Sequence, residues 1–430
     1  MTWRQVVSMS AALASIAAWG QTRAGNDALR PDDLVRMAVE RNKEFLATKQ
    51  RIAEAQGLLR QAGVRPSPTL EVEQSTGRPL GTRGEEEFSA GYFHTFEMFG
   101  KREKRLAVAQ KSVDLAEAEI AERTRQLTFD VKMRYAEAVA EQRKLEAVRR
   151  LLELNRQSYR ITEVRVEQGD AAPLERQLLL TDLSRAEAQQ ATFSGRVERA
   201  LLEVKRAVGL SPSEPLALAE EPLLTAMDLS SLGLKERALQ SRPDLRILRF
   251  LEQQSIAEVD LIRAEAKPNL TASARYSHRN SSFDQLGLNR AGEPTPLRDR
   301  DNIVTFGLSV PILRSRRNQG ALEAALARVA AARLRREHVE ASIRLEVEVG
   351  TRRWTAAKGT LEILNRGVVR QSEQNLAVIR ESYSLGQLRL LDVLNEQRRL
   401  IETQLGYIDA ESELFQSVTE LERAVGGTVQ

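Results

Sequence analysis

Residues 315–381 carry hydrophobic and small side chains at spacings that alternate between four and three. This heptad pattern predicts a helix that packs along its whole length against other helices. One unbroken helix of this span would be on the order of 100 Å long, more than a compact globular domain requires. A break at 382–386 and a returning helix would complete a long helix pair over 314–426. The patterned positions are Ile343, Val347, Gly350, Trp354, Ala357, Leu361, Leu364 and Val368.

A second helix pair of the same kind is predicted over residues 100–209. The first helix is expected to run to about residue 166, and the chain then turns at 167–173 and returns through 174–208. Shorter helices are expected at 31–63 and after Arg242-Pro243. The apolar positions of the first long helix again alternate by three and four, at Leu106, Ala109, Val113, Ala116 and Ile120.

Between the shorter and the longer helices, apolar and polar residues alternate strictly, and a period of two predicts β-strands. The pattern predicts two hairpins, at 68–96 and 268–310, and places a long polar loop over 279–300 in the second. Each strand is about ten residues long, which suits a tilted strand that crosses a bilayer. Aromatic side chains gather on the apolar face, where the lipid-facing girdle of such strands lies: Phe88, Tyr92, Phe96, Tyr276 and Phe306.

The two halves of the chain repeat one another. The separation of Gly169 from Gly386 equals that of Gly209 from Gly426, and this common separation is called the repeat offset here. Gly209 and Gly426 each end the same four-residue sequence, Arg-Ala-Val-Gly. Both halves also share the order helix, hairpin, long helix, turn and long helix. We therefore predict an internal duplication, with repeats at 25–209 and 235–430 and a linker at 210–234.

The N-terminus predicts an exported protein. Arg4 precedes a weakly apolar run from Val6 to Ala18, and Gly20 and Ala24 are candidate cleavage positions, which is typical of a signal peptide over 1–24. The chain has no cysteine, so disulfides and a lipid anchor on an N-terminal thiol are excluded. No later segment has the eighteen or so apolar residues of a spanning helix, so a membrane crossing would require the strands.

Composition excludes several classes of function. The 64 basic and 60 acidic residues alternate along the helices, and the net charge is only +4, so no nucleic-acid surface is expected. The three histidines, His94, His278 and His338, are scattered and form no catalytic or metal-binding spacing. We therefore expect no enzyme activity, no cofactor and no bound metal.

Four strands cannot close a barrel, and an open sheet edge leaves amides without partners in lipid. If the strands cross a membrane, several copies of the chain must share one barrel, and the long helices would continue it as a tube. For an isolated hairpin, packing inside a soluble protein is the competing interpretation. Here the opposite strand face is polar and the helices are too long to cover the sheet.

The mature chain resembles the TolC family of outer-membrane efflux channels. The resemblance rests on the duplicated layout and on three sequence segments, at 242–245, 308–312 and 383–395. The last, which reads YSLGQLRLLDVLN, is the most specific. It implies a mainly α fold with a small β part, in which a homotrimer forms a periplasmic α-barrel and a 12-stranded β-barrel in outer-membrane lipid. The implied partners are a periplasmic adaptor and a proton-driven inner-membrane pump of the resistance-nodulation-division type. The phrase at 95–102 is similar to the branch that serves heavy-metal efflux.

In the family, the phrase at 383–395 forms the periplasmic tip. Gly169 and Gly386 permit tight helix reversals, and Leu174, Leu391 and Leu394 offer apolar contacts either to neighbouring helices or to an adaptor. The resemblance makes gate candidates of Tyr383, Arg389, Asp392 and Asn395. Leu388 stands where the best-known member has an arginine, and Asn395 stands where it has an acidic residue, so gate closure by the same ionic contacts is not expected.

The sequence and the resemblance together predict a passive exit duct of a tripartite efflux system, with heavy-metal ions or drugs as candidate cargo. The outer-membrane component of a type I protein secretion system shares this fold and is the first alternative. A soluble periplasmic adaptor is the second, although such a protein should carry one helical hairpin, and this chain has two.

Overall fold

A computed structural model describes residues 28–80, 85–219, 233–312 and 318–428. The predicted signal peptide and most of the predicted linker lie outside the described residues. The chain divides into two compact units, and each is considered by itself. One comprises Met1–Asn42, Leu127–Ala226 and Arg353–Glu420, and the other comprises Lys43–Gln126, Met227–Arg352 and Leu421–Gln430.

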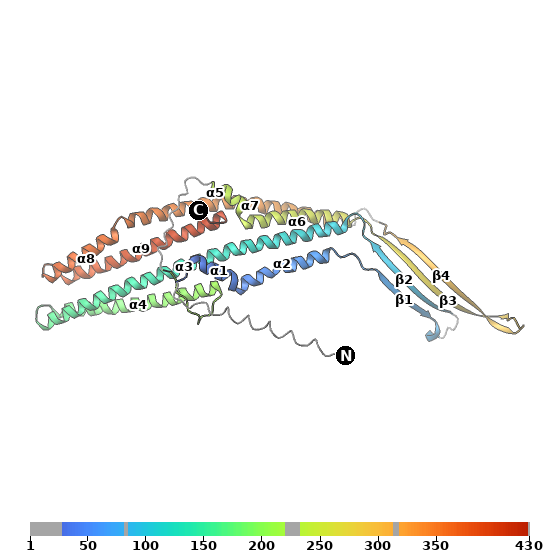
Figure 1. The fold of residues 1–430 in the computed structure, drawn as a ribbon, viewed down its shortest axis with the longest axis horizontal. Helices are drawn as coiled ribbons and strands as arrows, with labels where there is room; N and C mark the ends of the chain where they lie inside the picture. Colours follow the sequence, from blue (N-terminus) through green and yellow to red (C-terminus); the bar gives the residue numbers. More distant parts are fainter. Residues whose placement is uncertain (1–27, 81–84, 220–232, 313–317, 429–430) are drawn as a thin grey trace, which may run out of the picture. The chain divides into compact units, whose positions relative to one another are not determined.

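The order of elements repeats, as predicted. A pair of shorter helices, a β-hairpin and a pair of long helical segments follow one another twice along the chain (Figure 1). The first series is α1 (Pro31–Arg41), α2 (Lys43–Ala62), β1 (Thr69–Thr76), β2 (Glu85–Phe96), α3 (Lys101–Glu167) and α4 (Pro173–Val208), with a 3₁₀ turn at Arg78–Leu80. The second series is α5 (Leu234–Ser241), α6 (Pro243–Glu265), β3 (Leu270–Leu288), β4 (Pro294–Ser309), α7 (Gln319–Asn365), α8 (Val368–Ser384) and α9 (Leu390–Val425).

Two helices that the pattern predicts as single are interrupted. The helix expected over 31–63 breaks at Asn42, whose backbone is extended (φ −66°, ψ 110°). The prediction of one unbroken helix over 315–381 is wrong, because Gly367 adopts a left-handed conformation (φ 111°) between α7 and α8. Only a residue without a Cβ enters that conformation at low cost, so the glycine allows the change of direction.

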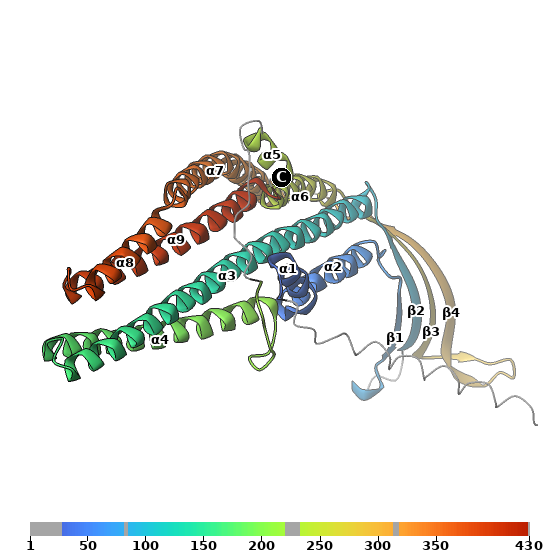
Figure 2. The same ribbon diagram turned by 60° about the vertical axis from the view of Figure 1, so that its left-hand side comes forward.

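The four strands form one antiparallel sheet in the order β1-β2-β3-β4, side by side in Figures 1 and 2. The prediction of a long loop at 279–300 is wrong, because β3 and β4 remain paired as far as Leu288 and Pro294, with one irregularity between Ser282 and Leu286. The residues there are polar, but ladder hydrogen bonds join backbone groups and do not require apolar side chains.

A tight turn joins β3 to β4. The side-chain Oδ1 of Asn289 accepts the backbone N–H groups of Ala291 and Glu293, each at 2.9 Å. Gly292 has a positive φ of 83° in the same turn. This is the local chemistry of an asparagine-initiated turn, and it closes the hairpin over a short span of chain.

The duplication extends to individual backbone contacts. Gly209 ends α4 with φ 85°, and a Cβ at this position would lie 2.9 Å from the carbonyl oxygen of Arg41, at the break between α1 and α2. Gly426 follows α9 with φ 88°, and its Cβ would lie 3.0 Å from Ser241 Oγ, at the junction of α5 and α6. In both halves, a glycine at a helix end therefore lets the chain approach a helix break closely.

The side chain of the residue at each helix break also donates a hydrogen bond to a carbonyl near the end of the last long helix in its half of the chain. Asn42 Nδ2 donates to the carbonyl of Ala207 at 2.9 Å, and Arg242 Nη1 donates to the carbonyl of Ala424 at 3.2 Å. The repeat offset separates these two alanines as well. Their carbonyls need such partners, since the last carbonyls of a helix have none within it.

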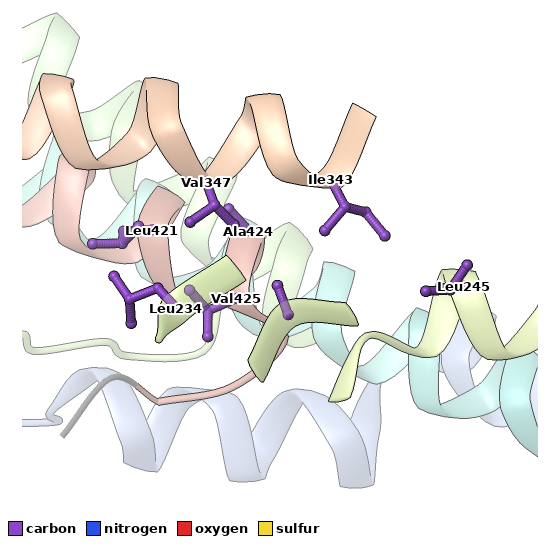
Figure 3. Close-up of a cluster of buried hydrophobic side chains, with 8 residues drawn as sticks. Leu234, Leu245, Ile343, Val347, Leu421, Ala424 and Val425 are labelled. Atoms are coloured by element: carbon purple, nitrogen blue, oxygen red, sulfur yellow. The ribbon is translucent and has the colours of Figure 1, made fainter. Parts of the chain in front are cut away.

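The predicted heptad seam is confirmed as the buried stripe of α7. Ile343 and Val347 are fully buried with Leu421, Ala424 and Val425 of α9 and Leu234 of α5 (Figure 3). Further along α7, Trp354, Ala357 and Leu361 are also buried, whereas Val368 is 39% exposed beyond the break at Gly367. Burial of this stripe supplies the main favourable free energy for a helix pair of low aromatic content.

Candidate functional site: the sheet faces and the helical tip

Two turns, at 168–172 and 385–389, join α3 to α4 and α8 to α9; with the adjoining helix ends they are called the tip here. In the first turn, the N–H of Asp170 donates to the carbonyl of Arg165 at 2.8 Å, and Gly169 has φ 82°. In the second, the N–H of Gln387 donates to the carbonyl of Ser382 at 2.9 Å, and Gly386 has φ 75°. The two turns thus end their helices in the same way, with a left-handed glycine and a bond to a late carbonyl.

An apolar cluster lies beneath these turns. Leu179 of α4 is fully buried against Leu390 and Leu394 of α9, and the rings of Tyr159 and Tyr383 pack on them. Leu394 is only 3% exposed, so its contacts are with the neighbouring helices of its own chain. This cluster joins the α3–α4 hairpin to the α8–α9 hairpin.

Tyr383 also makes a polar link between the hairpins. Its hydroxyl donates to Glu175 Oε2 at 2.7 Å, and the guanidinium of Arg165 lies over its ring, 5.3 Å from the centroid. Burial and the hydrogen bond to Glu175 raise the pKa of the Tyr383 hydroxyl above its usual value. The phenol therefore stays protonated and keeps donating at physiological pH.

Two further polar links join the same hairpins. Arg398 of α9 donates to Asp182 of α4 at 3.0 Å, and Arg380 of α8 donates to Ser158 of α3 at 3.2 Å. Burial lowers the pKa of Arg380, with no carboxylate to offset it. The hairpins are thus held together by the apolar cluster and by these side-chain bonds.

The other gate candidates lie at the surface of the tip. The backbone N–H of Arg389 donates to Asp392 Oδ2 at 3.0 Å, so Asp392 acts as a capping group at the start of α9. The side chains of Arg389, Asp392 and Asn395 are exposed in the single chain. A carboxylate in the first turn is also favoured by the helix dipole.

The apolar surface of the tip consists of leucines. Leu174 is 67% exposed and Leu391 is 55% exposed, each at the start of a returning helix, and Leu385 in the second turn is 66% exposed. Leu174 and Leu391 occupy equivalent places in the two halves, since the repeat offset separates them. Exposed large apolar groups in one small region are typical of a protein contact.

Sequence reasoning missed Glu175, the partner of Tyr383. A signal for it exists, since Glu175 precedes Asp392 by the repeat offset and is therefore its counterpart in the first half. Both are acidic residues in the first turn of a returning helix. Arg380 and Ser158 carry no comparable signal.

The sheet has one apolar and one polar face, as the alternation predicts. Cross-strand register places Leu70, Tyr92, Ala274 and Phe306 in one row and Val72, Ala90, Tyr276 and Val304 in the next. Most large side chains in these rows are exposed, from 41% for Tyr276 to 81% for Phe306. In the unit that contains the sheet, α2 and α6 end where the strands begin and do not lie over the sheet (Figures 1 and 2).

Phe88 and Phe96 lie on the same face. Phe88 shares a row with Gln74, His278 and Asn302, and Phe96 pairs with Leu270 where the strands leave the helices. Their exposed fractions are 40% and 46%. All five predicted girdle residues thus share the apolar face, and Phe88 and Phe96 flank its middle rows.

The polar face is crossed by ion pairs. Arg275 extends over Gly91 to Glu71 and Glu73 on β1, with N···O distances of 3.4 and 2.8 Å. A Cβ at Gly91 would lie 2.9 Å from the Phe93 ring and 3.5 Å from Arg275 Nε. Arg279 pairs with Glu87, which lies directly opposite it on β2, at 3.1 Å. Charged groups that satisfy one another across three strands are suited to a wet surface.

Among the described residues, no helix is both long and apolar enough to span a membrane. The same part of the chain holds no cluster of three or more histidine, aspartate or glutamate side chains arranged to bind a metal ion.

Comparison with known proteins gives consistent results. The family model described as outer membrane efflux protein matches residues 34–210 and 234–427. The solvent efflux pump outer membrane protein SrpC of Pseudomonas putida is 24% identical over 432 residues, which cover 92% of this chain and 84% of SrpC. Among solved structures, VceC from Vibrio cholerae aligns with a TM-score of 0.70 at 19% identity, over 93% of this chain and 97% of VceC. CusC aligns with a TM-score of 0.75 at 18% identity, over 95% of this chain and 96% of CusC.

Proposed function

The chain belongs to the outer membrane efflux protein family, and from this membership we infer that it is the exit duct of a tripartite efflux system. It resides in the outer membrane and extends into the periplasm as a homotrimer, and it works with a periplasmic adaptor and an inner-membrane pump. The observation that carries the inference is the family match over both halves, together with a sheet that is apolar on one face and ion-paired on the other.

Membership of this family contradicts the alternative that the chain is a soluble periplasmic adaptor. The curated relative is a component of a solvent efflux pump, which favours efflux over protein secretion. The name of SrpC makes organic solvents a candidate cargo. Heavy-metal cargo and a pump of the resistance-nodulation-division type stay predictions from the sequence. The chain itself is proposed to have no catalytic role, since its family consists of channels.

Deletion of the gene, complemented with the intact chain, tests the duct. Loss of the protein should increase sensitivity to toluene, to metal salts or to both, and this comparison identifies the cargo. Purified trimers should conduct ions in a planar bilayer. A trimer that inserts and does not conduct, or a deletion that changes no sensitivity, would contradict the duct.

The apolar sheet face is proposed to contact lipid, with Phe88, Tyr92, Phe96, Tyr276 and Phe306 as its aromatic residues. Their common face and exposure support this assignment, and aromatic side chains are typical of the interfaces of transmembrane strands. The polar face with Arg275 would then line the water-filled interior. The sequence repeats at 25–209 and 235–430 are proposed as the structural units of duplication, supported by the equivalent contacts of Gly209 and Gly426.

The tip is proposed as the gate and as the surface for the adaptor. Opening requires the α8–α9 hairpin to separate from the α3–α4 hairpin, so the bond from Tyr383 to Glu175 would stabilise the closed state. Arg389, Asp392 and Asn395 remain gate candidates through contacts with other copies, since their side chains are exposed. Gly169 and Gly386 shape the two turns, and Leu174 and Leu391 supply the adaptor surface, whereas Leu394 acts by packing beneath it.

Tyr383→Phe tests the gate. A hydrogen bond to a charged group contributes about 1.5–3 kcal/mol, so its loss should raise the fraction of open channels about tenfold or more. Single-channel recording measures this fraction. Tyr159→Phe is the matched control, because the Tyr159 hydroxyl bonds to Glu163 on its own helix. Equal effects of the two variants would show that Tyr383 does not act through Glu175.

A further inference from the structure

On β4, near the turn that joins it to β3, positively and negatively charged side chains lie on opposite faces of the sheet. Residues 298–301 read Arg-Asp-Arg-Asp, and successive side chains of a strand point to opposite faces. Arg300 lies opposite Asn280 and Arg298 opposite Ser282, so both arginines continue the face that carries Val304 and Phe306. Asp299 and Asp301 fall on the polar face.

These two arginines differ from the others in the paired part of the sheet. Arg275 and Arg279 form ion pairs with glutamates on the polar face. In the described part of the chain, neither Arg298 nor Arg300 has an ion pair, and both side chains are exposed. They lie past the apolar rows of this face and form no ion pair with a described residue.

Their position along the strand coincides with the end of the apolar rows. Arg300 is eight residues from Leu308, or about 26 Å along the strand at 3.3 Å per residue. For a strand tilted by about 40°, Arg300 lies about 20 Å and Arg298 about 25 Å from Leu308 along the membrane normal, and the apolar band of such barrels is about 25 Å tall. The guanidinium groups therefore reach the level of the lipid headgroups.

No other described group on this face forms an ion pair with them. The row of Arg300 holds Thr76, Glu86 and Asn280, and Glu86 is two strands away on β2. The next row toward the helices holds His278 and Asn302, whose side chains bond to each other at 2.9 Å. On β4 itself, the rim of the apolar face is positively charged.

We propose that Arg298 and Arg300 bind phosphate groups of lipid in the outer leaflet of the outer membrane. A guanidinium presents paired N–H donors that match phosphate oxygens, and the anionic headgroup supplies the partner that the protein lacks. The strand ends that join α3, α6 and α7 face the periplasm, so the turn at 289–293 lies on the outer side. The proposal rests on the lipid-facing assignment of the apolar face made above.

The test uses full-length trimers in nanodiscs of phosphatidylcholine that contain bisphosphorylated lipid A, its monophosphoryl form, or neither. The variant R298Q/R300Q removes two charges from the apolar face, and R275Q/R279Q removes two from the polar face as the matched control. Native mass spectrometry counts bound lipid A, and titration gives its affinity. Since one basic residue near an anionic surface contributes about 1 kcal/mol, R298Q/R300Q should bind bisphosphorylated lipid A about 30-fold more weakly.

The control variant should bind as the unaltered chain does, and the monophosphoryl form should bind more weakly to the unaltered chain. Unchanged binding by R298Q/R300Q, or an equal loss in both variants, would overturn the proposal. Heat-dependent gel mobility verifies that each variant forms trimers.

The variant Val304→Trp tests the lipid-facing assignment of the apolar face separately from the phosphate site. Brominated lipid chains should quench the fluorescence of the introduced tryptophan if the apolar face contacts lipid. Absence of quenching would overturn the lipid-facing assignment and this proposal with it. Quenching with unchanged lipid A binding in R298Q/R300Q would overturn the phosphate site alone, and bilayer conductance tests the duct independently of both.

Discussion

Gly209 and Gly426 each allow a close backbone contact within their own half of the chain. Both have a positive φ, and both face a helix break at a distance where a Cβ would be 3.0 Å or less from another atom. A residue with a Cβ would lose about 1–2 kcal/mol to the left-handed conformation alone. The contact is therefore specific to glycine for two independent reasons.

Gly209→Ala should destabilise the protein by about 2 kcal/mol or more, because backbone strain and the contact with Arg41 add. Chemical denaturation in detergent measures the change. Gly195→Ala is the control, since Gly195 lies inside α4 with no atom within 4 Å of its Cβ position. It should stabilise by about 0.5–1 kcal/mol. A neutral Gly209→Ala would mean that the chain relaxes away from the break.

Asp244 is a partly buried residue whose ionisation should contribute to stability. Burial alone would raise the pKa of Asp244, but the hydrogen bonds and charge of Arg242 outweigh it and hold that pKa below its usual range. Arg242 is itself buried and also pairs with Glu346. This network fixes the junction of α5 and α6 against α7 and the end of α9.

The stabilisation by Asp244 should be complete above its unfolded pKa of about 4 and should fall as the pH drops through the lower folded value. Thermal unfolding of the unaltered chain and of Asp244→Asn at pH 7 and pH 3 measures this. The difference between the two proteins should be large at pH 7 and should shrink at pH 3. A difference independent of pH would show that the Asp244 charge contributes nothing.

At the scale of elements, the two helical hairpins of the tip combine a rigid interior with an apolar exterior. Leu179, Leu390 and Leu394 are buried between helices, whereas Leu174 and Leu391 remain exposed at equivalent places. The duplication therefore presents the same apolar side chain twice. If these surfaces bind the adaptor, as proposed above, a trimer offers six sites for it.

The double variant L174E/L391E should abolish binding of the periplasmic adaptor, because each glutamate would place a charge in the apolar contact. Pull-down or surface plasmon resonance with the purified adaptor measures binding. Leu202→Glu is the control, since Leu202 is 48% exposed on α4 but far along the helix from the turn. Retained binding by L174E/L391E would place the adaptor surface elsewhere.

At the scale of the whole molecule, the sheet accounts for the trimer. β1 and β4 are its two edges, and each has ladder groups without a partner in the sheet. Unpaired backbone groups are costly in lipid, and only closure removes them. Three copies of the four-stranded sheet, as the family assembles, complete a 12-stranded barrel.

Neighbouring residues on β4 test the face assignment in the assembled protein. Val304→Arg should impair membrane insertion, because an arginine facing lipid near the bilayer midplane costs about 2–4 kcal/mol per copy. Ile303→Arg, one residue away on the polar face, should insert normally. The amount of heat-modifiable trimer in outer-membrane fractions measures insertion. Equal behaviour of the two variants would contradict the assignment of the faces.

Features that depend on local chemistry could be predicted from the order of amino acids alone. Heptad spacing marked the buried stripe of Ile343 and Val347, alternation assigned Tyr92 and Phe306 to one face, and the glycines at 169 and 386 marked the turns. The repeat offset revealed the duplication. These signals are local or repeated along the chain, so no knowledge of distant contacts was needed to recognise them.

Features that depend on distant partners became visible only in the folded chain. The bond from Tyr383 to Glu175 joins residues 208 apart, and Arg242 reaches a carbonyl 182 residues away. The break at Gly367 and the full length of β3 and β4 were missed for a related reason. A glycine within a helical pattern does not say whether the helix bends, and polar residues form a ladder only when a partner strand is in register.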